Sequence, residues 1–344
     1  MILGRGCFIA LRRFGKYIDF MPRKPRLFVP GALHHVMARG IEGRSIFNDD
    51  EDRFHFLSLL SEGIAQCGFK CYAWVLMDNH YHLLLRTNEK PLSVLMRSLN
   101  SKYARWFRKK NHSSGYVFQD RFKSIVTQDQ GYIEQLVRYI HLNPIRARKC
   151  KTIANLDHHP WSGHAVLMGT KQSVFQDTRD ILRRFGKDHR IAVQEYRRFI
   201  QEGIDRDDGR GLMKFIRMNN KDAIDRHEPG CWIIGDQEFV KAALEHDKTN
   251  RLQVASYRKN GWTIQKVVEE VARQLKIDAG EILKRGRGNE RSIFRKVAAA
   301  LSHRVCGMPI IGIARFYGIG AASVSRMLDA GEQYAREKNI SLKQ

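Results

Sequence analysis

The sequence predicts an α+β protein, in which a βαββαβ domain is followed by an all-α region ending in a helix-turn-helix. Two observations carry this prediction. Up to about residue 150, short aromatic and aliphatic runs alternate with amphipathic helical stretches. Beyond it the chain shows helical periodicity with many charges, and glycines mark the breaks between helices.

Local signals place each element of the first domain. Gly31 and Gly40 bound the first strand, and acidic residues at 49–52 open the first helix, where they complement the helix dipole. Asp78-Asn79 is a turn signal between two apolar strands, which therefore form a hairpin. The elements are a strand at 33–39, a helix from 49–52, strands at 69–77 and 80–86, a helix at 93–110, strand character at 116–127 and a helix at 130–142. This order is the split ferredoxin-like pattern, one antiparallel sheet with helices packed on one face.

Composition divides the chain into four segments. Residues 1–20 are expected to be an N-terminal extension, because Met21 followed by Pro-Arg-Lys-Pro-Arg is a more natural start for a folded domain. The first domain spans 21–165. A helical connecting region is expected at 166–260, and the helix-turn-helix domain at 261–335.

Charge and cysteine usage narrow the partner and the compartment. The 60 Lys and Arg exceed the 36 Asp and Glu, and a formal net charge of +24 favours a nucleic-acid partner. An anionic membrane surface is the alternative. No basic amphipathic helix stands apart, however, and no apolar run approaches the roughly 20 residues that span a bilayer, so no membrane partner is expected. The six scattered cysteines are typical of a reducing cytoplasm.

His80 and His82 are the sharpest chemical feature. In the predicted strand they point to one face while Tyr81 points to the other, and two imidazoles so placed can bind one cation. Taken alone, such a pair is more often an ordinary polar pair on a solvated sheet face. Two further histidine pairs are adjacent, so their rings would face opposite ways in extended chain, and we expect them to be chance pairs: His34-His35 and His158-His159.

Tyr139 and Asn143 lie four residues apart and share one helix face. A phenol is a poor nucleophile at its ordinary pKa, but a divalent cation on a phosphate neutralises charge and orients the phosphorus for in-line attack. The carboxamide of Asn143 can supply a third, neutral ligand. The alternative for Tyr139 is a core aromatic that packs against the sheet.

From about residue 21 to 161 the chain resembles the HUH endonuclease superfamily, and most closely the REP-associated tyrosine transposases, which use a single tyrosine. Four motifs carry the resemblance in order: H-V-M-A-R-G at 35–40, M-D-N-H-Y-H-L-L-L at 77–85, G-Y-V-F-Q-D-R-F at 115–122 and Y-I-H-L-N-P-I-R-A at 139–147. The chain departs from the pattern at Tyr81, where an aliphatic residue is usual; a tyrosine is bulky enough to pack behind the sheet.

The resemblance implies that His80, His82 and Asn143 bind Mg²⁺ or Mn²⁺ and that Tyr139 is the nucleophile. It implies a 5′-phosphotyrosine intermediate and a free 3′-OH that can rejoin strands. The expected substrate is single-stranded or hairpin DNA, with hairpins of repetitive extragenic palindromes as the suggested target. The expected location is the bacterial cytoplasm, in association with the nucleoid.

Basic and aromatic residues interleave between 97 and 123. Basic side chains can track a DNA backbone while exposed rings stack on unpaired bases. The alternative is a solvated basic surface. The residues of the first domain that we expect to contact DNA are Arg97, Lys102, Arg105, Arg108, Lys109, Arg121, Lys123 and Arg138.

A helix from Ile310, a turn at 318–320 and a helix from Ala321 have helix-turn-helix spacing. The segment from about 264 to 330 resembles the C-terminal DNA-binding domain of the bacterial replication initiator DnaA. The Asp-His-Thr-Thr run of that initiator's recognition segment is absent here. The resemblance implies contact with duplex DNA, and the second helix places three residues for it: Ser323, Ser325 and Arg326. The alternative is a helical bundle that binds protein.

The leading interpretation is a transposase that cleaves and rejoins single-stranded DNA. One alternative is a non-catalytic DNA-binding regulator, although such a protein has no chemical need for the histidines, Tyr139 and Asn143 together. The other is a metal-dependent hydrolase that activates water, in which Tyr139 would be structural. The oligomeric state stays open, with a homodimer as one option.

Overall fold

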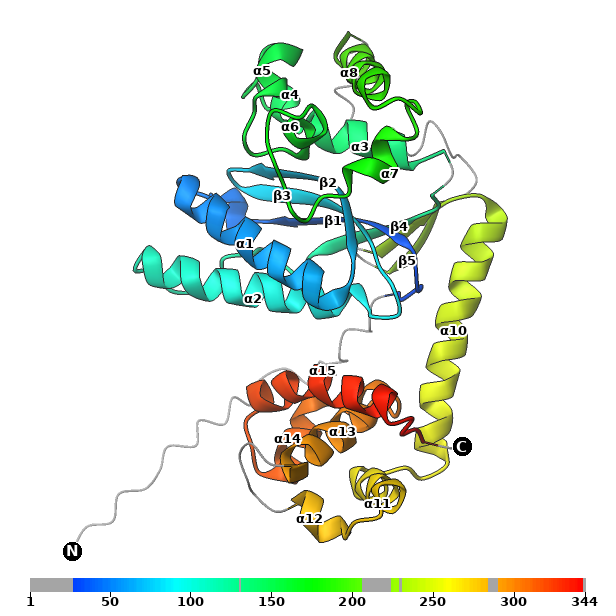
Figure 1. Cartoon of the computed structure of the whole chain (residues 1–344). Coiled ribbons are helices and arrows are strands. Elements are labelled where there is room, and N and C mark those ends of the chain that lie inside the picture. The colour runs from blue at the N-terminus through cyan, green and yellow to red at the C-terminus, as the bar shows by residue number, and fades with distance from the viewer. Residues whose placement is uncertain (1–26, 130, 206–223, 229–230, 284–289, 343–344) are drawn as a thin grey trace, which may run out of the picture.

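The computed structural model describes residues 27–129, 131–205, 224–228, 231–283 and 290–342. The expected extension at 1–20 lies outside the described residues. A sheet with helices on both faces forms the first domain, and the C-terminal helices gather in a second group below it (Figure 1). The predicted α+β fold class is confirmed.

A six-stranded sheet is the centre of the first domain, with strand order β2-β3-β1-β4-β6-β5. The strands are β1 (Leu33–Arg39), β2 (Lys70–Met77), β3 (His80–Arg86), β4 (Lys123–Thr127), β5 (Ile224–Glu228) and β6 (Cys231–Ile234). The first four pair antiparallel, as expected. The strand predicted at 116–127 is shorter, because the residues before Lys123 form a loop that meets the end of β1 at a bridge between Phe118 and Gly40.

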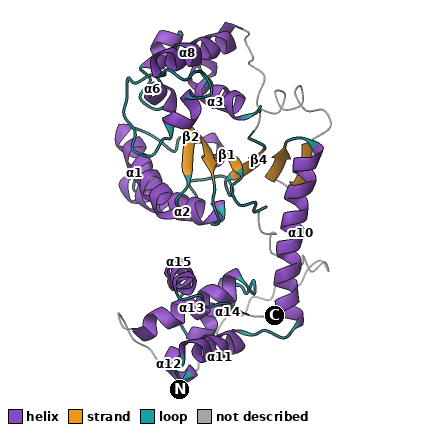
Figure 2. Ribbon diagram, turned by 45° about the vertical axis from the view of Figure 1, so that its right-hand side comes forward, coloured by secondary structure: helices purple, strands orange, loops and turns teal. Residues whose placement is uncertain are grey.

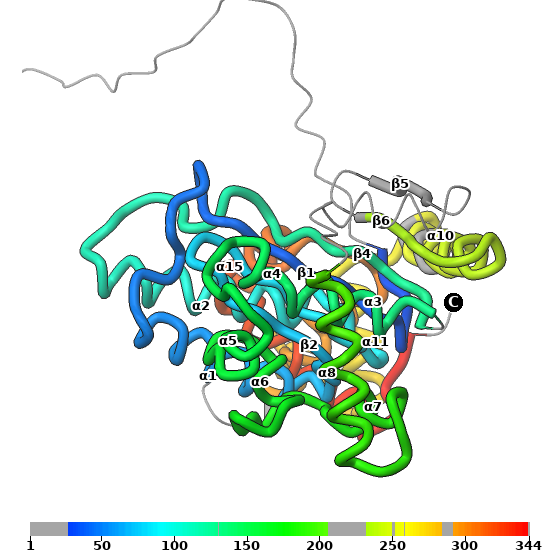
Figure 3. The backbone as a smooth tube through the Cα atoms, turned by 90° about the horizontal axis from the view of Figure 1, so that it is seen from above, coloured from blue at the N-terminus to red at the C-terminus, as the bar shows by residue number. Residues whose placement is uncertain are grey.

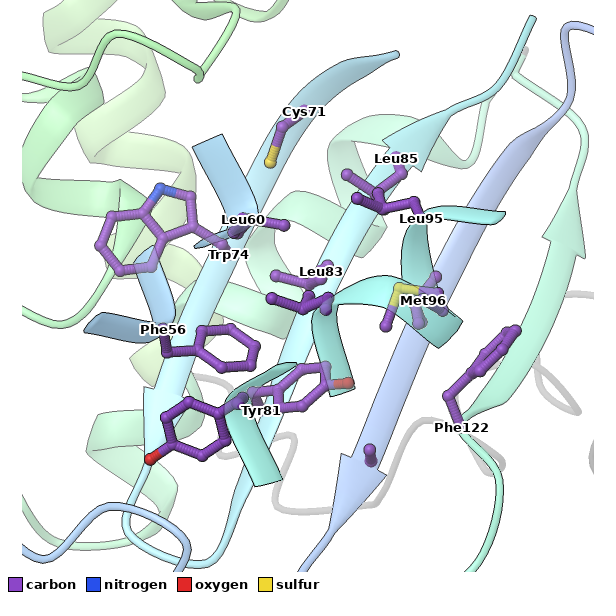
Figure 4. Close-up of a cluster of buried hydrophobic side chains, with 14 of the residues drawn as sticks. Phe56, Leu60, Cys71, Trp74, Tyr81, Leu83, Leu85, Leu95, Met96 and Phe122 are labelled. Carbon is purple, nitrogen blue, oxygen red and sulfur yellow. The ribbon is translucent and has the colours of Figure 1, made fainter. Parts of the chain in front are cut away.

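Helices α1 (Asp50–Cys67) and α2 (Leu92–Lys110) cover one face of the sheet (Figure 1). Asp49 caps α1 by accepting a hydrogen bond from the backbone N–H of Asp52, and Gly68 ends the helix in the left-handed region, with φ 70°. Apolar side chains of both helices pack with those of β1, β2 and β3 to form one core (Figure 4). The predicted boundaries of α2 are right to within one residue.

Helices also cover the opposite face, so the expectation of helices on one face only is wrong (Figure 3). These are α3 (Ile133–His141), α4 (Asn143–Arg146), α5 (Ile153–Asp157), α6 (Gly163–Leu167), α7 (Thr178–Leu182) and α8 (His189–Asp205). The physical reason lies in the strands, which are apolar on both sides: every residue of β2 after Lys70 is buried. Side chains such as Tyr72 and Val75 pack on this second face with Ile140 of α3.

Part of the region 166–260, which we expected to be a connector, belongs to the first domain. Ile181 of α7 and Tyr196 of α8 are fully buried in the core under α3. β6 extends the sheet by pairing parallel to β4, and helix α10 (Gln237–Lys259) packs near Val126 of β4. From there α10 leads to the C-terminal helices (Figure 2). Periodicity did not predict β5 and β6, because both strands are short and β5 is mostly charged.

The C-terminal helices share a separate core. They are α11 (Ile264–Leu275), α12 (Ala279–Leu283), α13 (Glu290–Arg304), α14 (Ile310–Tyr317) and α15 (Ala321–Glu337). The α14–turn–α15 arrangement lies where the sequence predicts it, with Gly318 at φ 61° in the turn. At Gly331 a Cβ would sit 2.0 Å from the carbonyl oxygen of Lys296, so α15 meets α13 backbone to backbone. None of the helices within the described ranges is long and apolar enough to cross a membrane.

Candidate active site

Strand β3 presents its two histidines to one face of the sheet, as alternation predicts. His80 and His82 have ring centroids 5.1 Å apart and lie on the side that α3 covers. Tyr81 points to the other side, where it is fully buried and its hydroxyl donates a hydrogen bond to Oδ1 of Asn100 at 2.7 Å. The unusual tyrosine at this position is therefore part of the core, and it leaves the histidine face unchanged.

Helix α3 brings Tyr139 against these histidines. The ring of Tyr139 lies edge-on to His82, with centroids 5.9 Å apart, and its side chain is half-buried. Tyr139 therefore lies in contact with His82 at the surface of the second core. The structure therefore brings Tyr139 to the histidines that the sequence singles out.

Asn143 lies one turn beyond Tyr139, at the start of α4 rather than within α3. Its Nδ2 donates hydrogen bonds to the backbone carbonyls of Tyr139 and Ile140, both at 3.0 Å. These contacts cap the end of α3, whose last carbonyls lack helical partners. Because only the amide nitrogen can donate, the carboxamide oxygen is the atom of Asn143 that can bind a cation.

Hydrogen bonds at Nδ1 orient both histidine rings. Oδ1 of Asn79 lies 2.7 Å from Nδ1 of His80, and Nε2 of His35 lies 2.9 Å from Nδ1 of His82. Burial, followed by the charge of Arg39, lowers the pKa of His80. Burial, followed by the neighbouring histidines and Arg146, lowers the pKa of His82 well below its ordinary value. Both rings are therefore neutral at pH 7, the form that binds metal.

The described residues contain no group of three His, Cys, Asp or Glu side chains arranged to hold a metal ion. The predicted set differs from such a group because its third member, Asn143, is an amide. Two neutral imidazoles, each already engaged at Nδ1, and one carboxamide oxygen are donors that suit a divalent cation. The donor set therefore fits a divalent cation, with further positions left for water or phosphate oxygens.

His35 also lies at this site, a contact that the sequence did not predict. Alternation does send the two neighbours to opposite faces: Nδ1 of His34 lies 3.0 Å from Oγ of Ser124, while His35 stacks on His82. Both histidines are buried. The signal that could have found His35 is the antiparallel pairing of β1 with β3, which places it diagonally beside His82.

Two arginines outside the predicted set also lie at the site. The guanidinium of Arg146 lies over the ring of Tyr139, 4.7 Å from its centroid, and Nη1 donates to the Tyr139 carbonyl at 2.9 Å. Arg39 pairs with His80 in the sheet register, so the two share a face. Positive charge therefore lies on two sides of the site, and such charge can attract a phosphate.

The expected DNA-contacting residues divide between the two faces of the sheet. Lys123 of β4 pairs with Met37, which pairs in turn with His82, so these three residues lie in one row on the site's face. Arg121 is exposed in the loop before β4. The others lie on α2, across the sheet from Tyr139: Arg97, Lys102, Arg105, Arg108 and Lys109.

Arg138 does not join either basic group. Only 9% of it is exposed, and its guanidinium packs 4.2 Å from the centroid of the Phe199 ring of α8. Its Nη2 donates to Oε1 of Gln135. Tertiary packing thus places Arg138 between α3 and α8, and its contact with DNA stays a prediction.

The C-terminal residues that we expect to contact DNA lie at the start of α15. Ser323 and Ser325 are partly exposed, Arg326 is exposed, and Nη2 of Arg326 donates to Oγ of Ser323 at 3.2 Å. The buried side of the same helix carries Val324 and Leu328. The three residues therefore flank the turn on the outer side of the C-terminal core.

Residues 29–143 match the family model for IS200-like transposases. The match includes His35, His80, His82, Tyr139 and Asn143. Among solved structures the chain is similar to a REP-associated tyrosine transposase bound to a REP hairpin, with 16% identity and a TM-score of 0.36 over 46% of this chain and 98% of that one. No curated protein matches the chain.

Proposed function

We propose that the chain is a single-tyrosine DNA transposase that cleaves and rejoins single-stranded DNA through a 5′-phosphotyrosine. One observation carries the proposal: Tyr139 of α3 packs against His82, beside His80, on a domain that matches the IS200-like transposases. In this proposal His80, His82 and Asn143 hold Mg²⁺ or Mn²⁺. The cation would neutralise phosphate charge and orient the phosphorus for attack.

The chain's own residues would perform the transfer. The phenol oxygen of Tyr139 attacks the phosphorus, the bond from phosphorus to the 3′-oxygen breaks, and that oxygen leaves as a 3′-OH after taking up a proton. The phenol proton leaves to solvent, which reaches the half-buried side chain. Arg146, stacked on the ring, stabilises negative charge that develops on the phenol. Rejoining is the reverse attack by a 3′-OH on the phosphotyrosine.

A covalent adduct tests this proposal. The full chain is incubated with labelled single-stranded DNA and Mn²⁺, then denatured and separated by size. We expect an adduct that disappears in Tyr139→Phe and persists in Tyr132→Phe, since Tyr132 lies at the start of the same helix and packs against the same core. An adduct that survives Tyr139→Phe would refute the assignment. Cleavage without any adduct would favour the hydrolase, and binding without cleavage the regulator.

DNA would reach Tyr139 along the row that carries Lys123. We propose that Lys123 and Arg121 contact phosphates of the bound strand. Lys123 lies on the sheet face that carries the histidines, and Arg121 lies in the exposed loop that leads into β4. Lys123→Ala should weaken binding of single-stranded DNA and reduce the slope of log K against log salt by about 1. Lys102→Ala, on the far face, is the matched control. Equal effects of the two changes would instead support the broad basic surface that the sequence predicts.

For the C-terminal helices we propose contact with duplex DNA at the start of α15. The observation that favours this second activity is the exposed group of Ser323, Ser325 and Arg326 beside a glycine-containing turn. Arg326→Ala should weaken duplex binding and leave adduct formation on single-stranded DNA unchanged. Unchanged duplex affinity would favour the protein-binding alternative.

A further inference from the structure

His35 lies against both His82 and Tyr139. It is fully buried, its ring stacks on His82 with centroids 5.1 Å apart and planes at 22°, and its Nε2 lies 2.9 Å from Nδ1 of His82. The same ring meets Tyr139 edge-on, with centroids 5.8 Å apart. No other ring of the described residues contacts both His82 and Tyr139, and His35 is not among the proposed cation ligands.

The hydrogen bond between His35 and His82 can run in two directions. A neutral imidazole carries one N–H, so His82 can offer the lone pair of Nε2 to a cation only when its proton is on Nδ1. Nε2 of His35 must then accept that proton, and His35 must carry its own proton on Nδ1. In the reverse arrangement His35 donates, His82 holds its proton on Nε2, and that nitrogen cannot bind a cation.

The corresponding bond to His80 has only one direction. Its partner is Oδ1 of Asn79, and an amide oxygen can only accept, so the proton of neutral His80 is held on Nδ1. For His82 the direction depends on His35, whose other nitrogen, Nδ1, is buried without a hydrogen-bond partner among the described residues. No described residue beyond His35 therefore fixes the direction of the hydrogen bond between His35 and His82. Nε2 of His35 is itself the acceptor that the Nδ1 proton of His82 needs.

We propose that His35 is a positioning residue that accepts the Nδ1 proton of His82 and so holds the Nε2 lone pair toward the cation. The inference rests on the proposed function of His80 and His82. Groups that orient a metal-bound histidine in this way change metal affinity when they are removed. His34 shows what a purely structural histidine looks like on the same strand: it is equally buried, but it bonds Ser124 on the opposite face.

The test is Mn²⁺ binding to the full chain without DNA, followed by electron paramagnetic resonance of the free ion. We expect His35→Phe, which keeps a ring but removes the acceptor, to raise the Kd for Mn²⁺ about 10- to 100-fold. His35→Gln can place its Oε1 near the position of Nε2 and should restore most of the affinity. His34→Phe is the matched control and should leave the Kd unchanged. A folded His35→Phe with an unchanged Kd overturns the proposal.

A second measurement requires no variant of the protein, so it does not depend on whether a substituted chain folds. Long-range ¹H–¹⁵N spectra of the unsubstituted protein with saturating Mg²⁺ should show His82 protonated at Nδ1, and protonation at Nε2 overturns the proposal. His80→Ala and His82→Ala separate the two levels of inference. If neither changes Mn²⁺ binding, the proposed metal site fails. If both abolish binding while His35→Phe does not alter it, only the positioning role fails.

Discussion

The hydroxyl of Tyr196 joins α8, beyond the family match, to the helix that carries Tyr139. It lies 2.8 Å from Nδ1 of His141 and 2.8 Å from Nδ1 of His164, and all three side chains are fully buried. Nε2 of His164 in turn lies 2.9 Å from Asp157, which also accepts from Arg197. The proton arrangement follows: His164 donates to Asp157, Tyr196 donates to His164, and His141 donates to Tyr196.

Tyr196→Phe removes both bonds without leaving a cavity. Each buried nitrogen that loses its partner costs about 1–3 kcal/mol, so two should lower the free energy of unfolding by about 2–6 kcal/mol. Burial already lowers the pKa of His141 well below its ordinary value, so this ring cannot regain hydration by becoming charged near neutral pH. The loss of the hydrogen bond between Tyr196 and His141 should therefore destabilise α3 itself.

Amide hydrogen exchange of α3, followed by mass spectrometry, is the assay. A loss of about 2–6 kcal/mol corresponds to exchange that is roughly 30- to 25,000-fold faster if α3 opens locally. Tyr132→Phe, in a residue that packs against the same core, should have a much smaller effect. Unchanged protection of α3 in Tyr196→Phe, or a stability loss under about 0.5 kcal/mol, would refute the idea that this network holds the helix.

Three further outcomes can be measured. Arg146→Gln removes the cation over the Tyr139 ring and should slow adduct formation about 5- to 30-fold, since the contact contributes about 1–2 kcal/mol; a rate within twofold of the parent would contradict this role. Burial lowers the pKa of His34 to about 4, so the unfolded chain takes up its proton first as pH falls below about 6.5, and stability is lost at about 1.4 kcal/mol per pH unit. Urea unfolding at pH 7 and pH 5 should therefore show a smaller fall in His34→Gln than in the parent. Gly331→Ala should unfold the C-terminal helices, because its Cβ would overlap the carbonyl of Lys296, and circular dichroism that shows full helicity at 37 °C would count against that close crossing.

Local rules were enough to locate the strands that carry the histidines. The predicted bounds of β1 and β3 agree with the structure, and alternation along β3 alone places His80 and His82 opposite Tyr81. Gly318 and its neighbours likewise predicted the α14–turn–α15 arrangement. The predicted metal ligands, the nucleophilic role of Tyr139 and the DNA contacts stay predictions until the experiments above are done.

Only the tertiary structure decided what surrounds the site. His35 reaches His82 through the register between two strands that are far apart in sequence, and Arg146 reaches Tyr139 across the break between α3 and α4. Arg138 looks like its basic neighbours until α8 packs over it. Residue type and spacing determine which face of an element a side chain occupies. Which distant element meets that face is set by long-range pairing and packing, and these leave little trace in a local pattern.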